Sequence, residues 1–149
     1  MTAKQIDPRG PRFGAAITNA LSLVIFFLAL ESATATYSYA LLGFVWFTFL
    51  LGVLLGNTSH PYGLLFKNLV RPRLNAPKEL EDARPPRFAQ LVGLLVASLG
   101  FALGFTIGAT GVAIAAAMLF FASFLQAYFA YCLGCKLYLG LRRIGLIRG

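Results

Sequence analysis

Residues 88–133 read FAQLVGLLVASLGFALGFTIGATGVAIAAAMLFFASFLQAYFAYCL and contain no Asp, Glu, Lys, Arg or His. The stretch is long enough for two membrane-spanning helices, because one span needs about 20 apolar residues. Gly108 and Gly111 interrupt it near its middle, which predicts a tight hairpin between spans at 88–108 and 110–133. The apolar runs are continuous and do not alternate, so helices are expected and a β-barrel is not.

The N-terminal half supplies two further uncharged spans, at 13–30 and 38–56, joined by a short turn as a second hairpin. Of the 149 residues, 58% are hydrophobic and only 12% are charged, about half the charged fraction of an ordinary soluble domain. The sequence therefore predicts an all-α membrane protein. We expect a single four-helix membrane domain over 1–149, in which two helical hairpins flank a loop at 57–87.

The 13 Lys and Arg residues fall into only three segments of the chain. They are Lys4, Arg9 and Arg12 before the first span, Lys67, Arg71, Arg73, Lys78, Arg84 and Arg87 in the loop, and Lys136, Arg142, Arg143 and Arg148 after the last span. Basic residues concentrate on the cytoplasmic side of multi-pass proteins, so both termini and the loop are predicted to be cytoplasmic, in the cell membrane. The net charge of +8 then reflects orientation in the lipid bilayer. No nucleic-acid-binding motif accompanies it, and no nucleic-acid partner is predicted.

The entrances to the first and third spans share a motif. Pro11-Arg12-Phe13-Gly14 recurs 75 residues later as Pro86-Arg87-Phe88-Ala89. An internal duplication would make the two hairpins parallel halves related by an axis along the membrane normal. Alternatively, Pro, Arg and Phe are each common where a helix enters a membrane, and the sequence leaves both interpretations open. Under duplication, 60–63 would correspond to 131–134.

The loop begins with an amphipathic segment. Over 62–71, apolar side chains recur at helical spacing between basic ones, which predicts a short helix on the membrane surface, ended by Pro72. The stretch 75–86 is polar and broken by prolines, so a solvated linker is expected. In the third span, small residues recur mainly every fourth position and predict a face for close helix packing within the chain, in preference to a dimer contact: Gly93, Ala97, Gly100, Gly104 and Gly108.

The spans contain no ionisable side chain of the kind that proton-coupled carriers place there, which argues against such a transporter. One histidine, His60, cannot ligate a haem with two histidines, and nucleotide-binding loops are missing, so no cofactor is predicted. The polar groups in and near the spans are expected to form interhelical hydrogen bonds: Thr18, Asn19, Ser22 and Gln126.

Both cysteines of the chain, Cys132 and Cys135, form one Cys-x-x-Cys motif at the cytoplasmic end of the fourth span. On a turn their sulfurs can reach disulfide distance, so that one thiol attacks a partner and the other resolves the mixed disulfide. A reducing compartment predicts a resting dithiol. Lys136 favours the thiolate, but the negative end of the spanning helix opposes it, so no strongly activated thiol is expected.

Packing and metal binding are alternatives for the two cysteines. The pair supplies two of the four ligands that a structural zinc ion needs. His60 would add a third and a dimer a second pair, but the sequence shows no complete set, and no metal site is predicted. If the halves are duplicated, His60 would lie near the thiols as a proton acceptor.

Five stretches resemble the bacterial membrane family called domain of unknown function 4395, and they extend over nearly the whole chain: 7–13, 60–66, 69–74, 85–90 and 132–135. The resemblance implies a small, actinobacterial-type four-helix membrane protein without an established activity. It also implies genes for thioredoxin-like proteins and rhodanese-type sulfurtransferases nearby. Cys132 and Cys135 carry over as candidate reactive positions, and five others as motif positions of unassigned role: His60, Arg71, Arg73, Arg87 and Gln90.

The leading hypothesis is a membrane protein whose cytoplasm-facing Cys132 and Cys135 exchange electrons or sulfane sulfur with a thioredoxin-like protein or a sulfurtransferase. The main alternative is a non-enzymatic accessory subunit of a larger membrane complex. A passive permease and a quinone-linked dithiol oxidoreductase are further alternatives. The sequence shows neither a continuous polar path for the former nor a motif for the electron acceptor of the latter.

Overall fold

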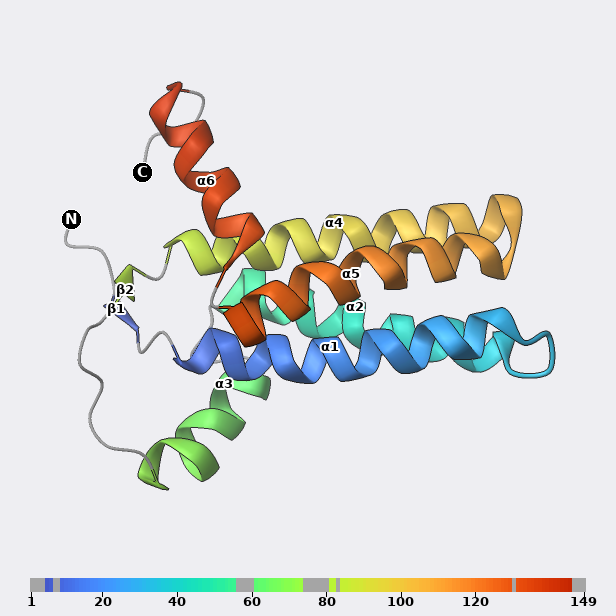
Figure 1. Cartoon of the computed structure of the whole chain (residues 1–149), viewed down its shortest axis with the longest axis horizontal. Helices are drawn as coiled ribbons and strands as arrows, with labels where there is room; N and C mark the ends of the chain where they lie inside the picture. The colour runs from blue at the N-terminus through green and yellow to red at the C-terminus, as the bar shows by residue number, and fades with distance from the viewer. Residues whose placement is uncertain are drawn as a thin grey trace.

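The computed structural model describes residues 5–6, 9–55, 61–73, 81–82, 84–129 and 131–145. Within these residues four long helices form a bundle: α1 (Arg9–Leu30), α2 (Ala35–Leu55), α4 (Arg84–Ile107) and α5 (Ala109–Phe129). Each is long and apolar enough to cross a membrane. Figure 1 shows them paired as two hairpins whose turns lie at the same end. The prediction of an all-α membrane protein with four spanning helices in two hairpins is confirmed.

Shorter elements lie at the opposite end of the bundle. α3 (Pro61–Leu65) continues as a π-helical segment, Phe66–Val70, and a 3₁₀ turn, Arg71–Arg73. The helix predicted over 62–71 is therefore present, and it runs through Pro72 because a 3₁₀ turn tolerates proline there. A two-residue pairing, β1 (Gln5–Ile6) with β2 (Glu81–Asp82), was not predicted.

The linker predicted over 75–86 is wrong at its end, because α4 already begins at Arg84. Pro85 and Pro86 occupy the first turn of this helix. Backbone N–H groups have no helical partner in a first turn, so proline loses nothing there, and its fixed φ suits the helix. Of the rest of that stretch, 75–80 and 83 lie outside the described residues.

The long helices form a ring. α1 packs on α2 and α5, and α4 packs on the same two helices from the other side. The apolar centre is built from all four helices: Ile25, Leu42, Val45, Ala97, Val112 and Ala116 are almost completely buried. Such a ring places the two hairpins face to face, with each helix antiparallel to both of its neighbours.

The small-residue face of α4 packs inside this ring, as predicted. A Cβ placed on Gly100 would lie 2.7 Å from the Cβ of Ala115 and 3.0 Å from Leu42 Cδ2. At Gly104, the Tyr39 hydroxyl donates a hydrogen bond to the backbone carbonyl at 2.7 Å. Glycine at these positions allows α2 and α5 to approach α4 closely, and van der Waals packing of this kind drives helix association in lipid.

Two arginines at equivalent positions of the two halves make the same kind of hydrogen bond between helices. Arg12, at the start of α1, donates from Nη2 to the carbonyl of Ala127 near the end of α5, at 3.1 Å. Arg87, at the start of α4, donates to the carbonyls of Val53 and Leu54 at the end of α2, at 2.7 and 3.1 Å. The last carbonyls of a helix have no helical partner and carry the negative end of its dipole. Each guanidinium therefore stabilises the C-terminal end of the helix to which it donates.

The short helices also occupy equivalent places. α3 and the π-helical segment after it follow α2 and pack on α1, where the Phe13 and Phe66 ring centroids are 5.8 Å apart. α6 (Leu133–Arg143) follows α5 and packs on α4, where the Phe88 and Tyr138 centroids are 5.6 Å apart. A duplication with a two-fold axis along the bundle predicts this repetition of contacts. The repeated sequence motif thus has a repeated structural role.

The described basic residues gather at one end of the bundle. They belong to the starts of α1 and α4, the segment from α3 to Arg73, and α6, which lie opposite the two hairpin turns in Figure 1. We call this the basic end of the bundle. Glu31 lies in the turn between α1 and α2, at the other end. The charge asymmetry of the sequence is therefore an asymmetry of the folded molecule.

Replacing Gly111 by alanine is expected to destabilise the bundle. A Cβ there would lie 2.5 Å from the backbone carbonyl carbon of Leu103, which cannot rotate away as a side chain can. Overpacking of this kind costs about 1–3 kcal/mol. Thermal unfolding in one detergent measures the loss. Gly140→Ala is the control, because nothing lies within 4 Å of that position. An equal loss in both variants would contradict this packing.

Candidate functional site

The two cysteines lie at a break between α5 and α6. α5 ends at Phe129, Tyr131 and Cys132 are not helical, and α6 begins at Leu133. The prediction of a span continuing through 110–133 is therefore wrong at its end. Figure 1 shows α6 leaving the bundle at a steep angle. The turn sets α6 at an angle to α5 at the basic end of the bundle, instead of extending the axis of α5.

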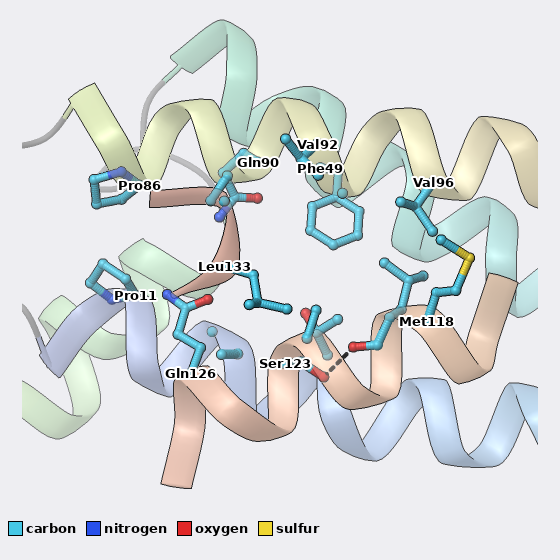
Figure 2. Close-up of a pocket in the computed structure, with 18 of the residues that line it drawn as sticks. Pro11, Phe49, Pro86, Gln90, Val92, Val96, Met118, Ser123, Gln126 and Leu133 are labelled. Carbon is cyan, nitrogen blue, oxygen red and sulfur yellow. Dashed lines mark hydrogen bonds between the residues drawn. The ribbon is translucent and has the colours of Figure 1, made fainter. Parts of the chain in front are cut away.

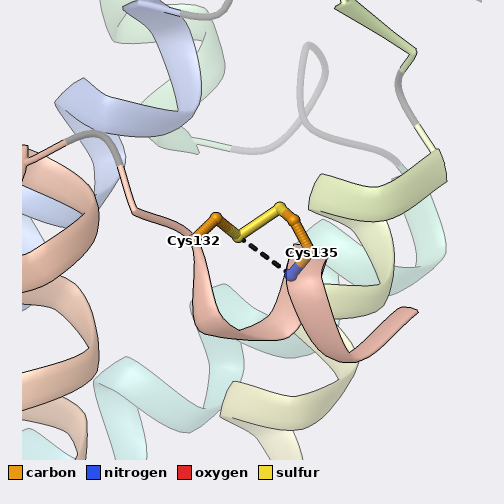
Figure 3. Close-up of a disulfide and its surroundings, with 2 residues drawn as sticks. All are labelled: Cys132 and Cys135. Atoms are coloured by element: carbon orange, nitrogen blue, oxygen red, sulfur yellow. Dashed lines mark hydrogen bonds between the residues drawn. A yellow bond between two sulfur atoms is a disulfide. The ribbon is translucent and has the colours of Figure 1, made fainter. Parts of the chain in front are cut away.

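Cys132 and Cys135 form a disulfide, with their Cα atoms 5.1 Å apart (Figure 3). That separation lies within the range that disulfides require. The sequence predicted a resting dithiol, and the structure has the oxidised pair. The turn permits the bond, and the redox poise of the surroundings decides whether it persists. The motif can therefore hold either state of a dithiol–disulfide couple.

Cys132 is the N-cap of α6. Its Sγ accepts a hydrogen bond from the backbone N–H of Cys135 at 3.1 Å, as the oxygen of a capping Ser or Asp would (Figure 3). The expectation that the pair follows the negative end of the spanning helix covers only one side of the junction, because Cys132 follows α5 and also begins α6. The pair lies at the positive end of α6, where free N–H groups and the helix dipole stabilise an anion such as a thiolate.

Gly134 sets how closely the motif approaches α4. A Cβ at this position would lie 2.6 Å from both the Cα and the Cβ of Ala89. The first turn of α6 therefore rests directly on the backbone of α4. Tyr138, buried one turn later, continues the contact on Phe88. These contacts fix the disulfide to the rigid bundle.

The surroundings of the disulfide carry positive charge. Both cysteines are half-buried, whereas Tyr131 and Lys136 beside them are exposed. The Lys136 Nζ lies 5.7 Å from the centroid of the Tyr131 ring, in a cation–π contact. Arg142 and Arg143, in the last turn of α6, are exposed as well. The sulfurs are thus within reach of a partner at the basic end.

A cavity of about 260 Å³ lies between the long helices, next to the motif (Figure 2). Leu133 and Gly134, the two residues between the cysteines, form part of its wall. Pro11 and Pro86, which occupy equivalent positions in the two halves, line it nearest the basic end. The wall is largely apolar, and its polar side chains are Thr18, Tyr62, Gln90, Ser123 and Gln126.

Two amides reach into this cavity. Figure 2 shows the side chains of Gln90, from α4, and Gln126, from α5, directed into it on either side of Leu133. No residue of the described part of the chain hydrogen-bonds to the Gln126 amide. The interhelical hydrogen bond expected for Gln126 is thus missing there, whereas Asn19 does donate to the carbonyl of Phe120 at 3.1 Å. The sequence assigned Gln126 to helix packing and not to a ligand site.

Tyr62 also lines this cavity, from α3, outside the spanning helices. Burial raises the pKa of Tyr62, and the Thr48 side chain opposes this in part. A raised pKa keeps the phenol protonated at neutral pH. Tyr62 therefore adds no formal charge to the cavity.

The structure separates the remaining motif positions by role. Arg87 caps α2, Gln90 lines the cavity, Arg73 is exposed, and only the backbone of Arg71 is described. His60 lies outside the described residues, so its approach to the thiols stays a prediction. Among the residues with a described position, no group of three His, Cys, Asp or Glu side chains could hold a metal ion.

Gly134→Val is expected to push α6 away from α4. Overpacking against the Ala89 backbone favours an open α6 by about 1.4 kcal/mol or more, a tenfold change in population. The rate of trypsin cleavage after Lys136 measures this opening, because proteolysis follows local unfolding. Gly140→Val is the matched control, since that position is open. Equal cleavage rates in the two variants would refute the close contact.

Comparison with known proteins gives one match. A model of the family described as a domain of unknown function (DUF4395) matches residues 6–143. No curated protein and no solved structure matches the chain. The matched residues include the four long helices, the cavity and both cysteines.

Proposed function

Because the chain belongs to the family described as a domain of unknown function, DUF4395, we propose its function from its own geometry. It is a membrane thiol–disulfide exchange protein in which Cys132 attacks and Cys135 resolves. The observation that carries this proposal is the capping position of Cys132, whose Sγ accepts the N–H of Cys135. A helix N-terminus stabilises a thiolate, and the thiolate is the nucleophile in disulfide exchange.

The exchange proceeds in two balanced steps. The Cys132 thiolate attacks a partner's disulfide, a mixed disulfide forms, and the partner's other sulfur leaves as a thiolate that takes up a proton. Cys135 then loses its proton and attacks the Cys132 sulfur, which closes the internal disulfide and releases the partner as a dithiol. One electron pair has passed to the partner, and the reverse sequence returns it.

Sulfane-sulfur transfer uses the same two residues. The Cys132 thiolate attacks the outer sulfur of a partner's persulfide, so that the partner leaves as a thiol and Cys132 becomes a persulfide. Cys135 then attacks the inner sulfur, which releases hydrosulfide and forms the internal disulfide. This sequence needs no oxidant other than the persulfide itself.

The partner we propose is a soluble thioredoxin-like protein or a sulfurtransferase. The half-buried disulfide lies outside the spanning helices, beside the exposed Tyr131 and Lys136. The basic residues of α6 would steer a protein whose reactive cysteine has an acidic rim. These features support docking at the basic end of the bundle.

We assign the basic end to the cytoplasm of the cell membrane. The assignment rests on the positive-inside rule and on the position of the described Lys and Arg residues at this end. It also presents the disulfide to the compartment in which thioredoxins are kept reduced.

Reporter fusions test this orientation. Alkaline phosphatase fused after Gly149 is expected to be inactive, because it would stay in the cytoplasm. The same reporter fused after Ala35, at the opposite end of the bundle, is expected to be active. Activity of the fusion at Gly149 with none at Ala35 would invert the orientation.

The accessory-subunit alternative would need a free helix face for its partner. The glycine-rich face of α4, which suited close contact with a foreign helix, is occupied by α2 and α5 of the same chain. A Cβ added at Gly93, Gly100 or Gly104 would meet side chains of these helices. A partner in the membrane would therefore have to use another face.

Trapping tests the roles of the two cysteines. The purified, reduced Cys135→Ser variant is mixed with a thioredoxin that lacks its own resolving cysteine and whose remaining cysteine is activated as a disulfide with thionitrobenzoate. Cys132 should displace thionitrobenzoate and form a mixed disulfide that neither protein can resolve. Cys132→Ser should give at least about tenfold less adduct, because the remaining thiol lacks the capping position. Non-reducing electrophoresis and mass spectrometry measure the yield, with the double serine variant as control. Equal yields, or two thiols inert to alkylation, would overturn the proposal.

A further inference from the structure

The cavity beside the disulfide extends to side chains that lie on the outer surface of the bundle. Met118 lines the cavity, yet 46% of its surface is exposed, and it lies near the middle of α5. Val92 and Val96 of α4 line the same region. Both helices are apolar enough to span a membrane, so the exposed side of Met118 would face the hydrocarbon layer. A ligand that enters here is one that dissolves in lipid.

The polar side chains of the cavity wall favour some classes of lipid-soluble ligand over others. An acyl chain would leave the Gln126 amide without a hydrogen bond, and an unpaired amide in an apolar site is costly. An amide offers both a donor and an acceptor. A ring with carbonyl oxygens would accept from its NH₂ group, and the corresponding hydroxyls would donate to its oxygen. The same side chain therefore suits the oxidised and the reduced form of a quinone.

Size and position agree with this chemistry. A volume of about 260 Å³ is just below the usual range of small-molecule sites and suits one substituted ring. Leu133 and Gly134 belong both to the cavity wall and to the loop between the cysteines. A ring in the cavity would therefore lie against the turn that carries both cysteines.

We propose that this cavity binds a membrane quinone, which takes an electron pair from the reduced Cys132–Cys135 pair. The two thiols lose two electrons and two protons as the sulfur–sulfur bond forms. The quinone gains the two electrons, its two oxygens take the two protons, and it leaves as a hydroquinone. The step rests on the thiol exchange proposed above, which would regenerate the dithiol from a soluble partner.

The test uses the reduced full-length protein in lipid nanodiscs, mixed without oxygen with decylubiquinone, whose fully substituted ring cannot add thiols. We expect one quinone reduced, and one disulfide formed, per protein. Quinone absorbance and alkylation of the remaining thiols follow the reaction. Ala122→Phe, which fills the cavity, should slow it at least about tenfold, whereas Ala20→Phe, on the exposed face of α1, should not.

A second variant avoids any effect on folding. Gln126→Leu keeps the side-chain size and removes the hydrogen bond, so the half-saturating quinone concentration should rise about five- to tenfold. Thioredoxin exchange is measured on each variant and should be unchanged. Normal exchange without quinone reduction, or equal quinone reduction in all variants, would overturn the quinone site and leave the exchange function standing. Loss of exchange in the wild-type protein would overturn the exchange function itself.

Discussion

The contact of Gly134 with the backbone of Ala89 holds the first turn of α6 against α4, and the chemistry of the chain depends on it. The contact sets α6 at a steep angle to the bundle and makes Cys132 a helix cap instead of the last residue of a spanning helix. It also brings Leu133 into the cavity wall. One close approach thus determines the place of the cysteines at a helix start, their exposure and their neighbours.

Much of the fold could be predicted from the sequence, because bilayer spans and one-sided charge are local properties of the chain. The break before α6 could not. Residues 130–133 are as apolar as the span before them, so hydrophobicity alone does not mark its end. The missed signal lies in 133–143, where buried Tyr138 alternates with exposed Lys136 and Arg142 in an amphipathic pattern.

The candidate site was predictable only in part. The cysteines are visible in the sequence, whereas the cavity draws its wall from α1 to α6 and depends on their packing. Gln126 resembled an ordinary interhelical hydrogen-bonding residue. The repeated motif gave one usable clue, since Pro11 and Pro86 line the cavity from equivalent positions. The two halves differ in one chemical feature, because only the second half carries thiols at the start of its short helix.

A redox titration of the Cys132–Cys135 pair tests the central claim most directly. The purified protein is equilibrated with defined ratios of reduced to oxidised glutathione, and of reduced to oxidised dithiothreitol for the lowest potentials, and its free thiols are counted by alkylation. We predict one reversible two-electron transition between about −120 and −270 mV, the range of thiol–disulfide oxidoreductases. A pair that stays oxidised below about −300 mV, as structural disulfides do, or that never forms a disulfide, would contradict the account.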